Sequence, residues 1–214
     1  SPHIQKINER FIFNDEEISD DNLSKLLIEV ENVNNGEQIT YFEILTAAYF
    51  YHASKFKDKI NIIESGLFHR FDATNIIDTN LSSIVTSIGL DHLDWLPKNE
   101  QNIEKIVYEK TSSLLNSNII VSKQSSDETL NLIKKTIMNN QSKKIIYKDN
   151  FNYSLSENNF IYYEDEYGGL KLPKPNLLGN FQIDNCMTAI ATVRNLQLGV
   201  KDENIKEGIT KIKS

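Results

Sequence analysis

The sequence contains only one cysteine, Cys186, so it can form no internal disulfide, and a reducing cytoplasm is the expected location. Hydrophobic runs are short, and none approaches the ~20 apolar residues that a membrane helix requires. Basic residues are fewer than acidic ones: the sequence has 23 Lys and Arg and 30 Asp and Glu, which gives a net charge of −7. This balance argues against a general nucleic-acid or anionic-membrane surface, although one local pocket could still bind a small anion.

Glycine is also scarce, and the placement of the eight glycines bears on nucleotide binding. They stand at 36, 66, 89, 168, 169, 179, 199 and 208, and none has the spacing of Gly-x-x-x-x-Gly-Lys-Ser/Thr. The 214 residues therefore lack the phosphate loop, whose backbone N–H groups and Lys hold ATP phosphates. The chain opens on Ser1-Pro2-His3 without an initiator Met, which predicts a processed or partial chain.

The 39% hydrophobic and 25% charged residues are an ordinary balance for a soluble globular protein, and 214 residues are enough for one α/β domain. Asp20-Asp21 is expected to cap a short helix, and Thr40-Tyr41-Phe42-Glu43 has the capping-box pattern of a second helix running to about Lys55. The apolar positions expected to be buried are Leu23, Leu26, Leu27 and Val30 in the first helix, and Ile44, Leu45, Ala48 and Tyr49 in the second.

Four short apolar runs, at 60–63, 84–88, 119–121 and 145–147, predict buried strands. Helices expected near 100–115 and 126–139 alternate with them, as in a parallel sheet. Residues 151–172 alternate polar and aromatic side chains around 156–159, which predicts an appended antiparallel hairpin. Helices at about 182–197 and 202–212 follow, the second capped by Asp202 or Glu203. The predicted fold class is α/β, a mostly parallel sheet flanked by helices with a small antiparallel hairpin near 151–172.

Polar side chains follow two of the predicted strands, where open parallel sheets bind ligands. Glu64 comes after the first strand, and His92 follows the second between Asp91 and Asp94. We expect Glu64 and His92 to converge and to share a divalent cation such as Mg²⁺, which prefers oxygen ligands. Other interpretations stay open, because an isolated Glu is more often a solvated loop acid or helix cap, and a lone His is more often structural.

Several ordered motifs extend over nearly the whole chain. They are Ser1-Pro2-His3-Ile4, Thr40-Tyr41-Phe42-Glu43, Glu64-x-Gly66 continuing to Arg70-x-Asp72-Ala73-Thr74-Asn75, residues 86–96 (TSIGLDHLDWL), Glu109-Lys110 and residues 185–191 (NCMTAIA). In this order they resemble the motifs of the folylpolyglutamate and dihydrofolate synthases, which are relatives of the Mur ligases. The resemblance implies a Mur-ligase central ATPase-like domain. It also implies ATP- and Mg²⁺-dependent ligation of L-glutamate to folate or dihydropteroate through an acyl phosphate.

The resemblance also assigns roles to individual residues. The metal ligands would be Ser1, Glu64 and His92. The catalytic residues would be His92 and Lys110, and Lys110 would be carbamylated. The pterin-bearing substrate would be bound by Thr40, Phe42, Phe71, Asp72 and Ala73, and ATP would be bound by Asn185. Several residues of these motifs have a simpler explanation beside this one. Thr40 and Glu43 are explained by helix capping, Phe42 by core packing, Lys110 by a solvated helix face, and Cys186 by a small buried side chain.

The sequence departs from the family pattern in three ways. The phosphate loop that precedes the Ser-Pro-His motif is missing, Phe68-His69 replace paired glycines, and no C-terminal domain follows Lys213. We therefore expect residues 1–214 to form one incomplete ATP-binding domain that is inactive alone. The alternatives are a non-catalytic remnant, half of a split ligase that needs a separate chain, or a ligase of another Mur branch, against which Thr40–Glu43 and residues 72–75 argue.

Overall fold

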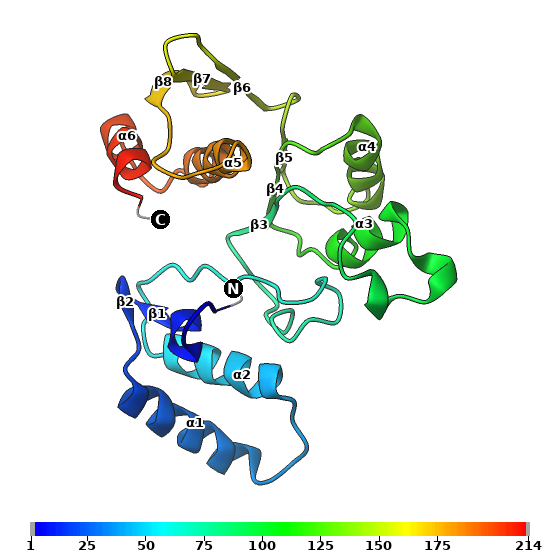
Figure 1. Ribbon diagram of the computed structural model, residues 1–214, viewed down its shortest axis with the longest axis vertical. Coiled ribbons are helices and arrows are strands. Elements are labelled where there is room, and N and C mark those ends of the chain that lie inside the picture. The colour runs from blue at the N-terminus through cyan, green and yellow to red at the C-terminus, as the bar shows by residue number, and fades with distance from the viewer. Residues whose placement is uncertain (1–2, 213–214) are drawn as a thin grey trace. The chain divides into compact units, whose positions relative to one another are not determined.

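The computed structural model describes residues 3–212, and the chain divides into two compact units, Ser1–Ile76 and Ile77–Ser214 (Figure 1). Helices are the main regular structure of the first unit, whose residues 54–76 form neither helix nor strand. The second contains a parallel sheet with helices on both faces and an antiparallel meander, which confirms the predicted α/β class.

The first unit is built on two packed helices, α1 (Asp20–Asn34) and α2 (Tyr41–Ala53). A 3-10 turn, η1 (Ile7–Arg10), and a short hairpin, β1 (Ile12–Phe13) with β2 (Glu16–Glu17), precede them. The core between these elements consists of Phe11, Ile18, Leu23, Leu26, Val30, Leu45 and Ala48, with Leu27, Ile44 and Tyr49 at its margin. The predicted apolar faces of both helices are therefore confirmed.

The two helix starts differ in how well the sequence predicted them. Helix α2 has the predicted capping box, in which the side chains of Thr40 and Glu43 each accept the other's backbone N–H. Helix α1 is capped by Ser19, whose side chain accepts from the N–H of Asn22, so the predicted cap at Asp20 is wrong by one residue. The two acids instead occupy the first turn, where a carboxylate interacts favourably with the helix dipole.

The strand predicted at 60–63 is wrong, because this stretch is irregular and belongs to neither a helix nor a strand. Ile60 and Ile62 are 58% and 90% exposed. An apolar run becomes a strand only when a neighbouring strand completes its hydrogen bonds. Among residues 3–212, no ladder pairs with this run, so its apolar composition alone does not make it a strand.

The sheet of the second unit has three parallel strands in sequential order: β3 (Ser82–Val85), β4 (Asn118–Val121) and β5 (Lys144–Ile146). The helices α3 (Ile103–Thr111) and α4 (Asp127–Thr136) make the two crossovers, and short 3-10 turns, η2 (Leu93–Trp95) and η3 (Lys98–Glu100), precede α3. The predictions for 119–121, 145–147 and both helices are confirmed within a few residues. The strand predicted at 84–88 ends at Val85 instead.

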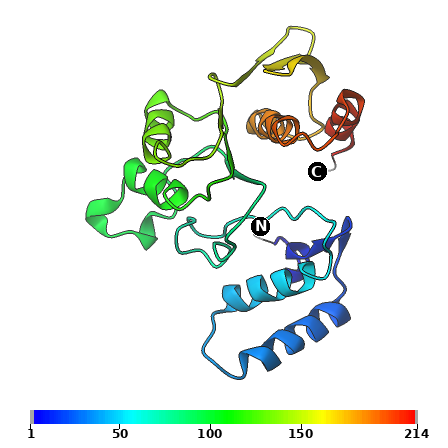
Figure 2. The same cartoon turned by 180° about the vertical axis from the view of Figure 1, so that it is seen from behind.

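The two faces of this sheet are covered by different helices, as opposite views show (Figures 1 and 2). Ile120 and Ile145 are register partners, and they pack into the core formed with helix α5 (Phe181–Asn195). Helices α3 and α4 lie together on the other side. Burial on both faces explains why β4 reads as a continuous apolar run rather than an alternating one.

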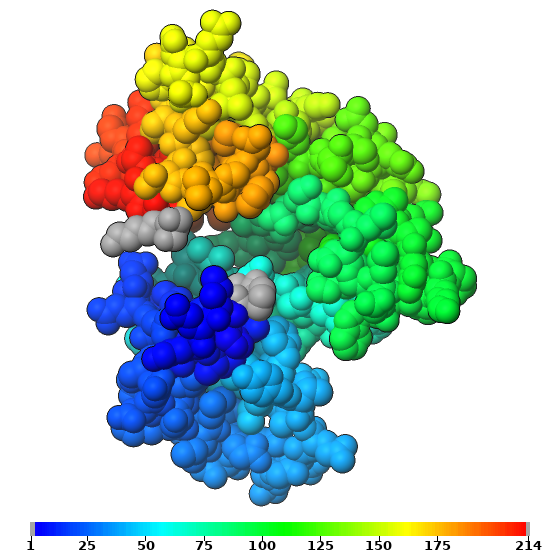
Figure 3. Space-filling model, in the orientation of Figure 1, coloured from blue at the N-terminus to red at the C-terminus, as the bar shows by residue number. Residues whose placement is uncertain are grey.

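Residues 151–173 form an antiparallel meander of β6 (Phe151–Leu155), β7 (Phe160–Asp165) and β8 (Gly168–Pro173). The predicted hairpin is confirmed, with its turn at 156–159, and β8 adds a third strand. One face of the meander packs on α5 and α6 (Asp202–Lys211), and the three elements form one continuous mass in the space-filling view (Figure 3). Helix α6 follows Lys201 without a side-chain cap, so the predicted caps at Asp202 or Glu203 are wrong. No described helix is long and apolar enough to cross a membrane.

Cys186 lies in α5 inside this core, as predicted, and burial raises the pKa of its thiol to about 11. Only the thiolate reacts with alkylating reagents. At pH 8 about a thousandth of this thiol is ionised, which follows from the three pH units separating 8 from 11. We therefore expect iodoacetamide to label the native protein at least a hundredfold more slowly than the urea-unfolded protein. Equal rates, measured by mass spectrometry, would mean that Cys186 is accessible in the folded state.

Candidate functional site

Asp72 organises the loop of the first unit that carries most of the predicted substrate-binding residues. Its buried carboxylate accepts four hydrogen bonds: Oδ2 from the N–H groups of Gly66 (2.9 Å) and Leu67 (2.8 Å), and Oδ1 from the N–H (2.9 Å) and hydroxyl (2.5 Å) of Thr74. These bonds fold residues 66–74 into a closed loop. Both Asp72 oxygens already bond within the loop, so this carboxylate shapes the site from within.

Phe42 and Gly66 bring helix α2 and this loop together. A Cβ atom at Gly66 would lie only 2.8 Å from Cζ of Phe42, so a glycine is required for the aromatic ring to lie against the backbone here. Phe42 stands two residues after Thr40, which caps α2. The structure thus brings the predicted residues Phe42 and Asp72 both against Gly66.

The other residues predicted in this unit differ in how far they are exposed. Phe71 is 82% exposed, and the guanidinium of Arg70 lies 4.1 Å from its ring centroid. Ala73 is half-buried between Asp72 and Thr74, and Glu64 is exposed just before the loop. Ser1, predicted to be a metal ligand, lies outside the described residues.

Phe68 adopts a left-handed backbone conformation, with φ at 55°, at a position where the related motif has glycine. This conformation costs an L-residue about 1 kcal/mol or more, whereas glycine adopts it freely. The structure therefore gives a physical reason for a glycine at this position. The loop keeps its left-handed residue although the side chain is bulky.

This strain predicts an unusual order of stability. Phe68→Gly should be more stable than Phe68→Ala by about 1 kcal/mol, because both variants lose the ring and only glycine relieves the backbone. The control is the same pair of changes at Phe71, whose φ is not positive and where Ala should be at least as stable as Gly. Urea unfolding followed by circular dichroism measures the differences. An Ala variant at Phe68 that equals the Gly variant would contradict the strain.

His92 and Lys110, the predicted catalytic residues, both belong to the second unit. His92 also has a left-handed backbone (φ 55°), and its Nε2 lies 3.3 Å from Oδ2 of Asp91. Lys110 lies in the last turn of α3 and is half-buried. Among the described residues, no group of three or more His, Cys, Asp and Glu side chains is arranged to hold a metal ion. The predicted convergence of Glu64 and His92 stays a prediction.

Gln124, which follows β4, holds the chain beyond β3 in place. Its Oε1 accepts from the N–H of Ile88 (2.9 Å), and its Nε2 donates to the carbonyls of Thr86 (3.1 Å) and Ser122 (2.9 Å). After β3 ends at Val85, the side-chain amide of Gln124 makes the backbone hydrogen bonds that a neighbouring strand would otherwise make. The buried Ile88 is therefore fixed outside any strand, which explains why the apolar run at 84–88 is longer than the strand.

Beside Gln124, polar groups gather at the carboxyl ends of the parallel strands. Oδ1 of Asp184 in α5 accepts from the Tyr153 hydroxyl at 2.5 Å and lies 3.8 Å from Nζ of Lys123. Burial, and then the hydrogen bond to Asp184, raise the pKa of Tyr153. Asn185, predicted to bind ATP, is the next residue of α5 and is exposed. The sequence analysis missed Lys123, Tyr153 and Asp184; Lys123 directly follows the strand end, which was a usable signal.

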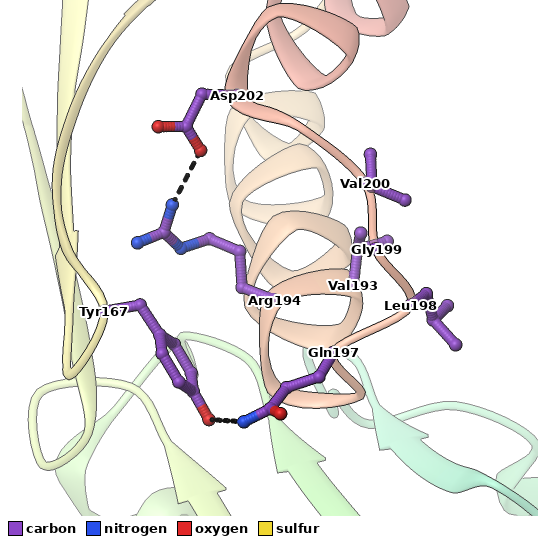
Figure 4. Close-up of a pocket in the computed structure, with 8 residues that line it drawn as sticks. All are labelled: Tyr167, Val193, Arg194, Gln197, Leu198, Gly199, Val200 and Asp202. Carbon is purple, nitrogen blue, oxygen red and sulfur yellow. Dashed lines mark hydrogen bonds and ion pairs between the residues drawn. The ribbon is translucent and has the colours of Figure 1, made fainter.

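A second arrangement that the sequence did not predict surrounds Arg194 at the end of α5. Nε and Nη2 of Arg194 donate to the two carboxylate oxygens of Asp165 (2.9 and 3.0 Å), and Nη1 donates to Asp202 (3.1 Å). Arg194 lines a pocket of about 250 Å³ together with Tyr167, Val193, Gln197, Leu198, Gly199, Val200 and Asp202 (Figure 4). Because its donors are engaged by neighbouring protein groups, Arg194 serves to join the meander to α5 and α6.

Comparison with known proteins gives this geometry a context, although no family model matches the chain. The dihydrofolate synthase/folylpolyglutamate synthase of Escherichia coli K12 is 28% identical over 98% of this chain and 47% of its own length. The structure of the bifunctional enzyme from Yersinia pestis CO92 matches with a TM-score of 0.85 and 26% identity, over 100% of this chain and 50% of that one.

A third match is the E. coli FolC structure in complex with DHPP and ADP, which has a TM-score of 0.84 and 29% identity over 99% of this chain and 49% of that one. The chain spans about half the length of the curated relatives it matches. Identity and fold agree along the same nearly complete stretch, and the motifs occur there in order. Over nearly its whole length, the chain is thus similar in sequence and in fold to folylpolyglutamate synthase/dihydrofolate synthases.

Proposed function

We propose that this chain contributes the substrate loop and the nucleotide-facing sheet edge of an ATP-dependent ligase that joins L-glutamate to folate or dihydropteroate through an acyl phosphate. The observation that carries the proposal is the match, over 99% of this chain, to an E. coli structure that holds DHPP and ADP. The proposal treats residues 1–214 as one incomplete ATP-binding domain of the Mur type. It places the protein in the cytoplasm.

The loop closed by Asp72 would present the pterin-binding surface. Its shape depends on Gly66, which allows the ring of Phe42 to approach, and on the bonds from Asp72 to the backbone. Preorganised contacts of this kind position a substrate before reaction. Thr40, Phe71 and Ala73 belong to the same unit and would complete the surface. Asn185, exposed on α5 near the strand ends, would contact ATP.

Mg²⁺ would be held by Glu64 and His92, together with Ser1 and carbamylated Lys110. The donor types fit in part, because a carboxylate and a carbamate supply the oxygen ligands that Mg²⁺ prefers, whereas the imidazole of His92 is a less usual ligand. When bound, the cation neutralises charge on the transferring phosphoryl group. His92 and Lys110 are the residues proposed to act nearest the reaction.

The test is a paired measurement of binding and ligation by the 214-residue chain. We expect 7,8-dihydropteroate to bind, but no glutamylated product to form with ATP, Mg²⁺ and glutamate. The sequence contains no phosphate loop, and losing such a set of preorganised donors lowers rates by orders of magnitude. If the chain is half of a split ligase, supplying a phosphate-loop segment as a separate polypeptide should produce ligation that Glu64→Gln removes.

The possible outcomes separate the proposals. Failure to bind dihydropteroate at all would contradict the folate assignment. Product formed by the chain alone, and abolished by Glu64→Gln, would show that the missing loop is dispensable. A chain that binds dihydropteroate but stays inactive with the added segment would favour the non-catalytic remnant.

A further inference from the structure

A chain of hydrogen bonds leads from Asp72 to the imidazole of His69. The Thr74 hydroxyl donates to Oδ1 of Asp72 at 2.5 Å, the Ser65 hydroxyl lies 3.2 Å from the Thr74 hydroxyl, and Nδ1 of His69 lies 3.2 Å from the Ser65 hydroxyl. All four residues belong to the first unit and lie within residues 65–74.

The direction of each bond follows from counting hydrogens. A hydroxyl has one hydrogen to donate, and that of Thr74 is given to Asp72. The Thr74 oxygen can then only accept, so Ser65 must donate to it. The Ser65 oxygen in turn can only accept from His69, which places a hydrogen on Nδ1 and leaves the lone pair of a neutral ring on Nε2.

The state of the ring supports the same assignment. Burial lowers the pKa of His69, and the charge of Asp72 opposes this only in part, so the imidazole is neutral at pH 7. No hydrogen bond to Nε2 occurs within residues 3–212. Nε2 is therefore a preoriented acceptor, fixed through Nδ1 in the way that supporting residues fix functional histidines.

The position of this acceptor relates it to the proposed substrate surface. Ser65 immediately precedes Gly66, which lies against the ring of Phe42, and Asp72 binds the backbone of Gly66 and Leu67. The same carboxylate thus anchors the Phe42 contact and the tautomer of His69. The related motif has glycine at this position, and glycine has no side chain that could accept a hydrogen bond.

We propose that His69 is a substrate-positioning residue whose Nε2 accepts a hydrogen bond from an N–H donor of the pterin ring. The inference rests on the proposed function, because it takes the pterin-bearing substrate as the ligand of this loop. The pterin ring carries donors suited to it, an exocyclic amino group and ring N–H groups. If His69 only supported the loop, substrate affinity would depend on its Nδ1 and not on its Nε2.

Two variants separate these roles, because each keeps one half of the imidazole. In His69→Asn the amide can still donate to Ser65 from about the place of Nδ1, but nothing reaches the place of Nε2. In His69→Gln the longer side chain places an amide oxygen near Nε2 and gives up the bond to Ser65. We expect Asn to weaken 7,8-dihydropteroate binding about fivefold to tenfold, the effect of one lost hydrogen bond, and Gln to stay within about twofold.

Calorimetric titration of the full chain measures both affinities. Retention of binding by Asn and loss by Gln would show that His69 acts only through Ser65 and would overturn the inference. Equal binding by wild type and Asn would overturn it too, with the folate assignment intact. Absence of dihydropteroate binding by the wild type would instead refute the proposed function, and the inference with it.

Nuclear magnetic resonance of ¹⁵N-histidine-labelled wild-type protein tests the tautomer independently of either variant. The chain has four histidines, so replacing His3, His52 and His92 in turn assigns the remaining signal even where a His69 variant does not fold. We expect a neutral ring protonated on Nδ1. A ring protonated on Nε2 would end the proposal.

Discussion

Arg194→Met should destabilise the second unit by about 3 kcal/mol, because it leaves the carboxylate of Asp165 buried without its cation. The side chain of Asp165 is 0% exposed and that of Arg194 is 9% exposed. The Tyr163 hydroxyl and the N–H of Tyr167 also donate to Asp165, but neutral donors compensate a buried charge less well than a guanidinium that bonds both oxygens. Urea unfolding followed by circular dichroism gives the free-energy difference.

A matched control lies in the same region. Lys143 and Glu166 form an ion pair whose side chains are 49% and 56% exposed, so Lys143→Met should cost less than about 1 kcal/mol. The double variant Arg194→Met with Asp165→Asn should recover part of the loss, because the unpaired charge is gone. Comparable losses for Arg194→Met and Lys143→Met would show that the Asp165 pair is no stronger than a surface pair.

Asp72→Ala should be the most damaging single change in the first unit, with an expected loss of about 3 kcal/mol. It removes the acceptor of three backbone N–H groups and one hydroxyl, and hydrogen bonds to a charged acceptor contribute more than neutral ones. Dihydropteroate binding should fall more than tenfold, because the loop that carries Phe71 and His69 opens.

Hydrogen exchange locates this effect. The amides of Gly66, Leu67 and Thr74 should lose their protection in Asp72→Ala, while those of helix α1 should change little. The exposed Asp58 of the same unit provides the control, since Asp58→Ala should change stability by no more than about 0.5 kcal/mol. Unchanged protection at Gly66 and Leu67 would mean that the loop is held by other contacts.

Local patterns predicted the fold well where the interaction itself is local. The capping box of Thr40 and Glu43 joins residues three apart, and the meander follows from alternation within one stretch. The run at 119–121 became a strand because β3 and β5 pair with it on both edges. The similar run at 60–63 did not, and only pairing with a distant segment distinguishes the two cases.

The sequence predicted those residues of the candidate site that belong to recognisable motifs. Ordered motifs led to Phe42 and Asp72, and the structure brings both against Gly66. The bond between Arg194 and Asp165 spans 29 residues and leaves no periodic signal in the sequence. The role proposed for His69 depends on which hydroxyl donates to which oxygen, and that order emerges only from three-dimensional distances.

The amide of Gln124 has a consequence for protein engineering. Gln124 accepts the N–H of Ile88, which lies 36 residues earlier in the sequence. The conformation of the segment that leads to His92 therefore depends on a side chain from the connection that follows β4. Residues 86–92 are therefore not a transferable module. If they were grafted onto another parallel sheet without a glutamine in the equivalent place, Thr86 and Ile88 would lose the backbone hydrogen bonds that the Gln124 amide makes in place of a neighbouring strand. In a sequence alignment, position 124 should accordingly vary together with the loop it supports rather than with its own neighbours.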